Sequence, residues 1–211
     1  MRISFRIAVA AAVFLLGSAY NANAGNYGGP GFAGTLWFNG ESGEVEQMGT
    51  VHVGSAGFLM NMASQGQKIS SLIKWDSETI WSLMHDQKMY MEIPPEQSGW
   101  EPYENRACMG YKNGEKQGSE TVAGRNTEKW RCTDQTMVPE GETAIDTTVW
   151  YDPELEFTVK SVDDNGEVFE VRDVQVGAQD ASMFEIPAGY KKFDMNAMMQ
   201  QMMQQGQQGQ Q

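Results

Sequence analysis

Residues 68–93 constrain the fold of this chain more than any other segment. Short runs of large apolar and β-branched residues alternate there with two polar clusters, at 76–78 and 85–87. Runs of this length, bounded by Asp and Ser, are typical of antiparallel strands joined by tight turns. The segment therefore predicts a meander of three strands.

Apolar side chains occupy both alternating positions in these strands. Ile73 and Leu72 have opposite parity, and so have Ile80 and Trp81. A sheet with one face in water would show a cleaner alternation of apolar and polar residues. The second face is therefore covered by helices, by more sheet or by a bound apolar ligand.

The chain on either side of the meander also predicts strands with little helix. The Asn-Gly dipeptide at 165–166 is a strong hairpin signal, and a second hairpin is expected to turn near Gly124. Residues 96–118 are polar and are expected to be irregular, whereas 178–183 predict a short helical turn. The remaining strands are expected at 35–38, 44–53, 58–62, 143–151, 155–162 and 168–176.

The N-terminal residues 1–24 predict a secretory signal peptide. Two arginines precede an apolar run that is too short to span a bilayer, and Ala-Asn-Ala at 22–24 suits cleavage. The alternative is a buried N-terminal helix. We expect a periplasmic or secreted mature chain that begins at Gly25 with no lipid anchor, and a flexible glycine-rich leader at 25–34.

The charge of the chain disfavours two classes of partner. It has 28 acidic residues against 15 Lys and Arg, a net charge of −13 at pH 7. Phosphate backbones and anionic lipid head groups repel such a chain. We therefore expect neither nucleic-acid binding nor stable electrostatic docking on a membrane.

The two cysteines, Cys108 and Cys132, predict a disulfide, because an even pair in an exported chain indicates one. A redox pair and a metal pair are the alternatives, but CxxC spacing and a neighbouring histidine are missing. The bridge would close a loop of about 24 residues and stabilise the fold by roughly 3 kcal/mol.

Motifs for catalysis are weak, and we expect no enzyme and no cofactor. His85 with Asp86 lies in a predicted turn, and Ser55 lacks the first glycine of a GxSxG elbow. Asp163 and Asp164 lack the ligand ladder of a calcium loop. The six tryptophans either line an apolar cavity or fill a core.

The C-terminal tail, 194–211, has a methionine stripe at helical spacing followed by Gln and Gly only. Thioethers are soft ligands that suit Cu(I). Packing of the stripe against the sheet or a protein partner is the alternative, and disorder is another. The stripe consists of Met195, Met198, Met199, Met202 and Met203.

Four motifs in this order resemble an uncharacterised family of exported bacterial proteins: IKWDSETIW at 73–81, QKMYMEIP at 87–94, WYDPEL at 150–155 and MFEIPAGY at 183–190. That family of unknown function is itself similar to the LolA/LolB superfamily of lipoprotein carriers. The resemblance covers most of the mature chain and implies one domain at 35–193. It implies an antiparallel half-barrel of about 10 or 11 strands, whose concave apolar face is covered by short helices and holds acyl chains.

These observations lead to one main hypothesis and two alternatives. The main hypothesis is a non-enzymatic periplasmic protein that holds a lipid, acyl chain or lipoprotein segment on its concave face, with the tail as lid or partner anchor. The alternatives are a Cu(I)-binding or envelope-stress protein that uses the tail, and a ligand-free interaction module with a filled core. The candidate contacts, taken from both parities, are Met60, Trp75, Trp81, Leu83, Met89 and Met91.

Overall fold

The computed structural model describes residues 27–39, 43–64, 66–77, 79–93, 106–136, 138 and 143–193. Strands dominate this part of the chain, as the short apolar runs between polar turns predict, and two short 3-10 helices accompany them. The elements are β1 (Phe32–Asn39), β2 (Val45–Gly54), β3 (Gly57–Ser64), β4 (Gln67–Lys74), β5 (Thr79–Met84), β6 (Met89–Ile93), η1 (Arg106–Cys108), β7 (Tyr111–Val122), β8 (Arg125–Gln135), β9 (Thr147–Asp152), β10 (Phe157–Asp163), β11 (Val168–Val176), η2 (Ala181–Phe184) and β12 (Lys191–Lys192).

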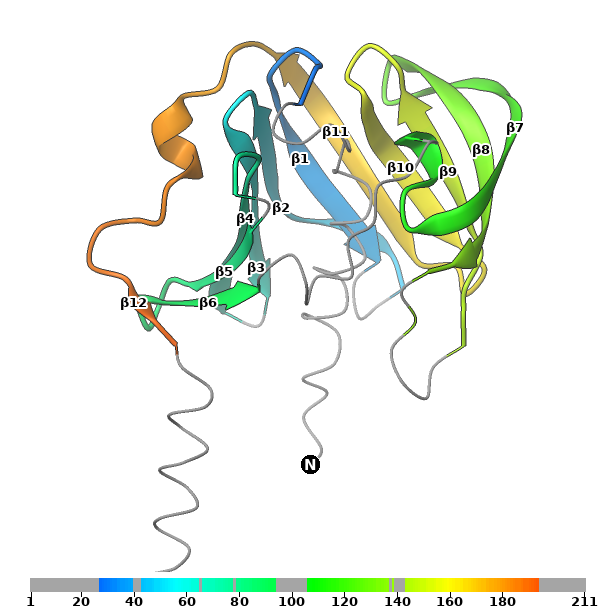
Figure 1. Cartoon of the computed structure of the whole chain (residues 1–211). Helices are drawn as coiled ribbons and strands as arrows, with labels where there is room; N and C mark the ends of the chain where they lie inside the picture. The colour runs from blue at the N-terminus through cyan, green and yellow to red at the C-terminus, as the bar shows by residue number, and fades with distance from the viewer. Residues whose placement is uncertain are drawn as a thin grey trace, which may run out of the picture.

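The strands form one sheet in the order β12-β6-β5-β4-β3-β2-β1-β11-β10-β9-β8-β7. Neighbouring strands are antiparallel, except that β12 is parallel to β6. The predicted meander is β4-β5-β6, and its turns lie where the polar clusters stand. The sheet is open and curled (Figure 1), as expected for the antiparallel half-barrel that the sequence predicted.

Aromatic contacts show how strongly the sheet curls. Phe58 on β3 and Phe157 on β10 are four strand positions apart, which is about 19 Å across a flat sheet. Their ring centroids are only 6.3 Å apart. These two side chains therefore meet across the concave face, and the main apolar core lies on that face.

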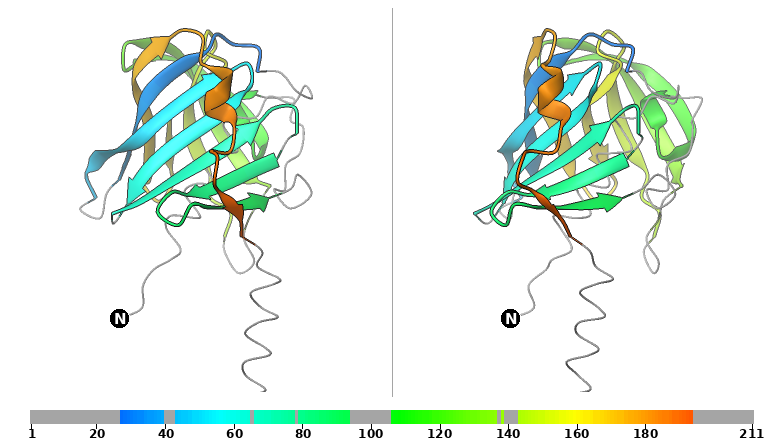
Figure 2. Two further views of the ribbon diagram at one scale, coloured as in Figure 1. Left: turned by 90° about the vertical axis from the view of Figure 1, so that its left-hand side faces the viewer. Right: turned by 60° about the vertical axis from the view of Figure 1, so that its left-hand side comes forward.

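The convex face of β2–β6 is crossed by residues 177–193, which we call the C-terminal strap (Figure 2). Phe184 of η2 is fully buried against Leu72 and Leu83. The resemblance implied that short helices cover the concave face. The short helix η1 packs on that face at the β7–β9 end, beside Val149, whereas η2 covers the convex face. The strap thus accounts for the apolar residues on the second face of the meander.

The ordered domain begins earlier than the expected boundary between leader and domain at residue 35. Phe32 is fully buried and pairs with Val53 of β2 and Val176 of β11. Tyr27 is also buried, and its hydroxyl donates hydrogen bonds to the carbonyl oxygens of Pro30 and Leu155. Glycine content suggested flexibility, but two large aromatic side chains fix this segment to the core.

Residues 111–118 are also more regular than expected, since they form most of β7. This strand is at the edge of the sheet, and residues 112–121 are exposed. The polar composition of 96–118 suggested an irregular segment because apolar alternation is absent. An edge strand with both faces in water needs no such alternation, and pairing with β8 holds it in place.

The predicted disulfide is confirmed. Cys108 in η1 is bonded to Cys132 in β8, with a Cα–Cα distance of 5.3 Å. The bridge lies in a small second apolar cluster with Ala107, Tyr111 and Val149. It fastens η1 to the β7–β9 end of the sheet.

The signal peptide and the methionine tail were predicted at residues outside the described ranges. Within those ranges, no helix has the length and apolarity needed to span a bilayer.

Candidate functional site

The register of β3–β6 places one parity of each strand on the concave face. Phe58, Ile73, Ile80 and Ile93 form a first row across the four strands. A second row follows two residues along, and a third row two residues further. The second row is Met60, Ser71, Ser82 and Met91, and the third, which we call the methionine row, is Met62, Ile69, Met84 and Met89.

Burial decreases from the first row to the methionine row. Phe58, Ile73 and Ile80 are 1%, 0% and 7% exposed. Every member of the methionine row is only half-buried. The concave face therefore has a filled end and, at β3–β6, an end where apolar side chains remain partly accessible.

Aromatic packing explains why the first end is filled. Phe157 contacts Phe32 edge to face, with ring centroids 5.2 Å apart, in addition to its contact with Phe58. Tyr27 stacks on Trp75 at 6.4 Å. A ligand at this end would have to displace packed rings, so the candidate site is the partly accessible end.

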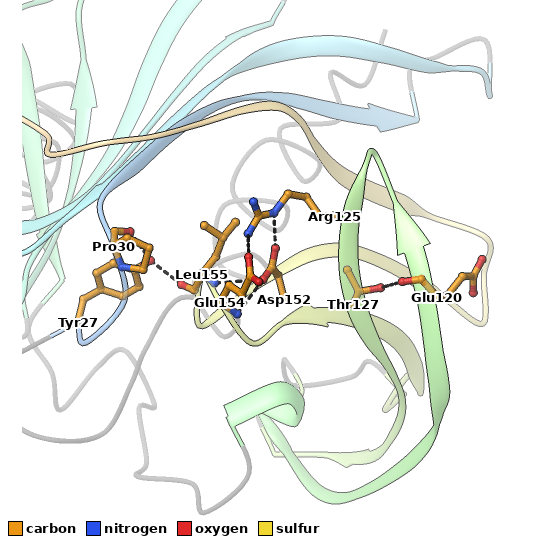
Figure 3. Close-up of polar contacts among 8 residues, drawn as sticks. All are labelled: Tyr27, Pro30, Glu120, Arg125, Thr127, Asp152, Glu154 and Leu155. Atoms are coloured by element: carbon orange, nitrogen blue, oxygen red, sulfur yellow. Dashed lines mark hydrogen bonds and ion pairs between the residues drawn. The ribbon is translucent and has the colours of Figure 1, made fainter.

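A polar cluster closes the filled end at the β9–β10 turn (Figure 3). Asp152 is fully buried and receives a 2.6 Å hydrogen bond from Arg125 Nε. Its other oxygen accepts the backbone N–H groups of Glu154 and Leu155. The cluster is internally satisfied, and it holds the turn whose carbonyl accepts the Tyr27 hydroxyl.

The electrostatics of this cluster follow from burial and pairing. Burial is the main cause that raises the pKa of Tyr27 above its ordinary value, and the neighbouring Glu156 raises it further. The hydrogen bond to Asp152 raises the pKa of Arg125. Both groups therefore hold their protons firmly, and the cluster serves to fix the turn.

Four of the predicted contact residues lie on the concave face and two do not. Met60 and Trp75 are buried in the main core, while Met89 and Met91 are half-buried at the accessible end. Trp81 and Leu83 have the opposite parity and lie on the convex face. Leu83 is buried there beside Phe184 of the strap, and Trp81 packs against the same cluster.

Sequence reasoning missed Met62, Ile69 and Met84, which share the accessible end with Met89. Tight turns fix hairpin register, so aligning the strands of the meander across the turns at 76–78 and 85–87 would have found Ile69 and Met84 beside Met89. The tail residues Met195, Met198, Met199, Met202 and Met203 lie outside the described ranges, and their alternative role in metal binding stays a prediction.

The structure also pairs His85 with a serine that sequence reasoning did not connect to it. Ser70 Oγ lies 2.6 Å from His85 Nε2 and donates to Asn61 Oδ1, while His85 Nδ1 contacts the hydroxyl of Tyr190. Ser70 is only 1% exposed, and its proton is committed to Asn61. This chain of hydrogen bonds therefore links Tyr190 of the strap, through His85, to Ser70 of β4.

Comparison with known proteins identifies the family. The domain of unknown function DUF4412 matches residues 32–149, more than half of the chain. The chain belongs to the DUF4412 family. This confirms the predicted membership of an uncharacterised family. The match includes the whole methionine row and ends before the strap of this DUF4412 protein. No curated protein matches the chain.

Several solved structures are similar to this chain at low sequence identity. The structure of PNGF-II has a TM-score of 0.51 at 12% identity, over 81% of this chain and 32% of that one. An uncharacterized conserved protein from Thermus thermophilus has a TM-score of 0.48 at 10% identity, over 88% and 98%. LprF from Mycobacterium bovis has a TM-score of 0.38 at 16% identity, over 86% and 98%.

Proposed function

We propose that this DUF4412 protein is a non-enzymatic binding protein that holds an apolar ligand, such as a lipid or acyl chain, at the accessible end of its concave face. The half-buried methionine row carries the proposal. It places apolar side chains from β3, β4, β5 and β6 side by side on the concave face, each with part of its surface accessible. Contact with a ligand would remove this area from water.

The composition of the accessible end suits a flexible apolar ligand. Methionine is unbranched and adapts its shape, so a surface rich in it tolerates ligands of different outline. Ser71 and Ser82, in the adjacent row, add hydroxyl groups without charge. We propose contacts with Met62, Ile69, Met84, Met89 and Met91.

We further propose that the protein works after export, in the periplasm or outside the cell. The disulfide between Cys108 and Cys132 supports this location, because such bridges persist in oxidising compartments. The N-terminal sequence supports it as well, because residues 1–24 have the pattern of a secretory signal peptide.

Two measurements on the mature chain test the binding proposal. Native mass spectrometry of protein purified gently from periplasm, followed by solvent extraction, should reveal a releasable lipid. The delipidated chain should then enhance the fluorescence of the apolar probe 1-N-phenylnaphthylamine, and a fatty acid should displace the probe.

A polar double variant, Met84→Gln with Met89→Gln, locates the binding surface. Each change removes about 1 kcal/mol of apolar contact, so the probe Kd should rise about tenfold or more. Met183→Gln is the matched control, since this half-buried methionine belongs to η2 on the convex face. A lipid-free mass together with no probe binding by the unaltered chain would instead support a ligand-free interaction module.

A further inference from the structure

Thioether groups are concentrated on one face of β3–β6. Met60, Met62, Met84, Met89 and Met91 all have the parity of Phe58 and lie on the concave face. Core filling explains Met60, which is fully buried. Met62 is half-buried and also packs against the main core, whereas Met84, Met89 and Met91 are half-buried at the accessible end and belong to no core cluster of the described residues.

The strand register brings three of these methionines together. Met84 and Met89 are direct partners across the β5–β6 hairpin, and Met91 follows Met89 on the same face of β6. Directly opposed residues have Cβ atoms about 5 Å apart, and same-face neighbours along or diagonal to the strands about 7 Å. Three long, flexible side chains at these spacings have the reach to place their sulfur atoms around one ion.

The chemistry of this surface selects a soft cation. Thioether sulfur binds Cu(I), whereas carboxylate and carbonyl oxygens bind Mg²⁺ and Ca²⁺. Within the described ranges, no group of three or more His, Cys, Asp or Glu residues is placed to hold a metal. The other members of the second and third rows on β4 and β5 are Ile69, Ser71 and Ser82, which carry no charge.

We infer that Met84, Met89 and Met91 form a binding site for a single Cu(I) ion on the concave face. Partial exposure gives the ion access, and the net charge of −13 attracts cations to the protein. This inference goes beyond the proposed function, because it assigns a metal to the sulfur atoms rather than to the apolar area of the same side chains.

Replacement by leucine separates the two roles. The variant Met84→Leu, Met89→Leu, Met91→Leu removes the sulfur atoms but keeps apolar side chains of similar volume. The matched control carries leucine at all five tail positions, from Met195 to Met203, in the otherwise unaltered mature chain. Cu(I) binding is measured without oxygen by competition with a coloured Cu(I) chelator, and probe binding with 1-N-phenylnaphthylamine.

We expect the unaltered chain and the tail variant to withdraw a single Cu(I) from the chelator, and the sheet variant to lose this ability while it still binds the probe. The inference is overturned if the unaltered chain withdraws no Cu(I), if the sheet variant retains Cu(I), or if the tail variant loses it. Cu(I) binding by a chain that never binds the probe would sustain this site and overturn the proposed function.

A second measurement needs no substitution in the sheet. Ag(I), a soft cation of the same charge that peroxide does not oxidise, stands in for Cu(I) and should protect Met84, Met89 and Met91 of the unaltered chain from oxidation by hydrogen peroxide, as followed by peptide mass spectrometry. Met183 on the strap should oxidise equally with and without Ag(I). The inference is overturned if Met84, Met89 and Met91 oxidise as fast with the cation as without it.

Discussion

At the scale of single residues, Asp152 is the most deeply buried charged side chain among the described residues. Its side chain is 1% exposed, and it accepts hydrogen bonds from Arg125 and from two backbone N–H groups of the β9–β10 turn. A buried carboxylate is tolerated only when it is paired and hydrogen-bonded. Asp152 meets both conditions, because one oxygen is paired with Arg125 and the other accepts the two backbone N–H groups.

Replacing Asp152 with alanine should therefore lower the free energy of unfolding by about 3 kcal/mol, because Arg125 Nε and both backbone N–H groups lose their acceptor and Arg125 keeps only its pair with the exposed Glu154. Urea unfolding followed by tryptophan fluorescence measures the loss. Lys116→Ala is the control: it breaks the more exposed pair with Glu128 and should cost about 1 kcal/mol or less. Equal losses in the two variants would contradict this account.

At the scale of elements, the C-terminal strap is attached at several points along β2–β6. Gln179 contacts His52, and Glu185 forms a 2.8 Å ion pair with Lys74. Beyond Tyr190, β12 pairs with β6. Phe184 lies between these attachments and is fully buried, so its side chain supplies most of the apolar contact of η2.

Replacing Phe184 with alanine should cost about 3–5 kcal/mol, as for other buried Phe side chains, and should loosen the strap before the sheet. Hydrogen exchange should then accelerate at 177–193 more than in β8–β11. Met183→Ala, one position away and half-buried, should leave exchange of the strap nearly unchanged. Uniform acceleration over the whole chain would show that strap and sheet open as one unit.

At the scale of the whole molecule, two cross-connections stabilise the curled sheet. Aromatic contact between Phe58 and Phe157 closes the concave face, and the disulfide fastens η1 to β8. The proposed binding surface lies on β3–β6, whereas the disulfide lies at β7–β9. Stability and ligand binding should therefore respond differently to loss of the bridge.

The double variant Cys108→Ser, Cys132→Ser should lose about 3 kcal/mol of unfolding free energy, since the unfolded chain regains the entropy of an open loop. Below its unfolding transition, it should bind the apolar probe with the affinity of the unaltered chain. Treating the unaltered chain with a reductant should reproduce both results. Loss of probe binding in the folded variant would show that the disulfide also shapes the accessible end.

The sequence by itself determined the elements that depend on neighbours in the chain. Alternation of apolar residues and polar turns indicated the meander at 68–93, Asn165-Gly166 marked the β10–β11 hairpin, and the cysteine pair indicated the disulfide. The meander and hairpin signals are local in the chain, and two cysteines allow only one pairing within the chain. The family and its half-barrel fold were recognised from the order of such motifs.

Only the tertiary structure decided which parity faces the concave side. Trp81 and Leu83 are as apolar as Met84 and Met89, and a strand pattern gives the relative faces of residues but not which face is inside. That choice depends on curling, which joins Phe58 to Phe157, and on the strap, which covers Leu72 and Leu83. Both involve residues far apart in the chain, so no local pattern in the meander encodes them.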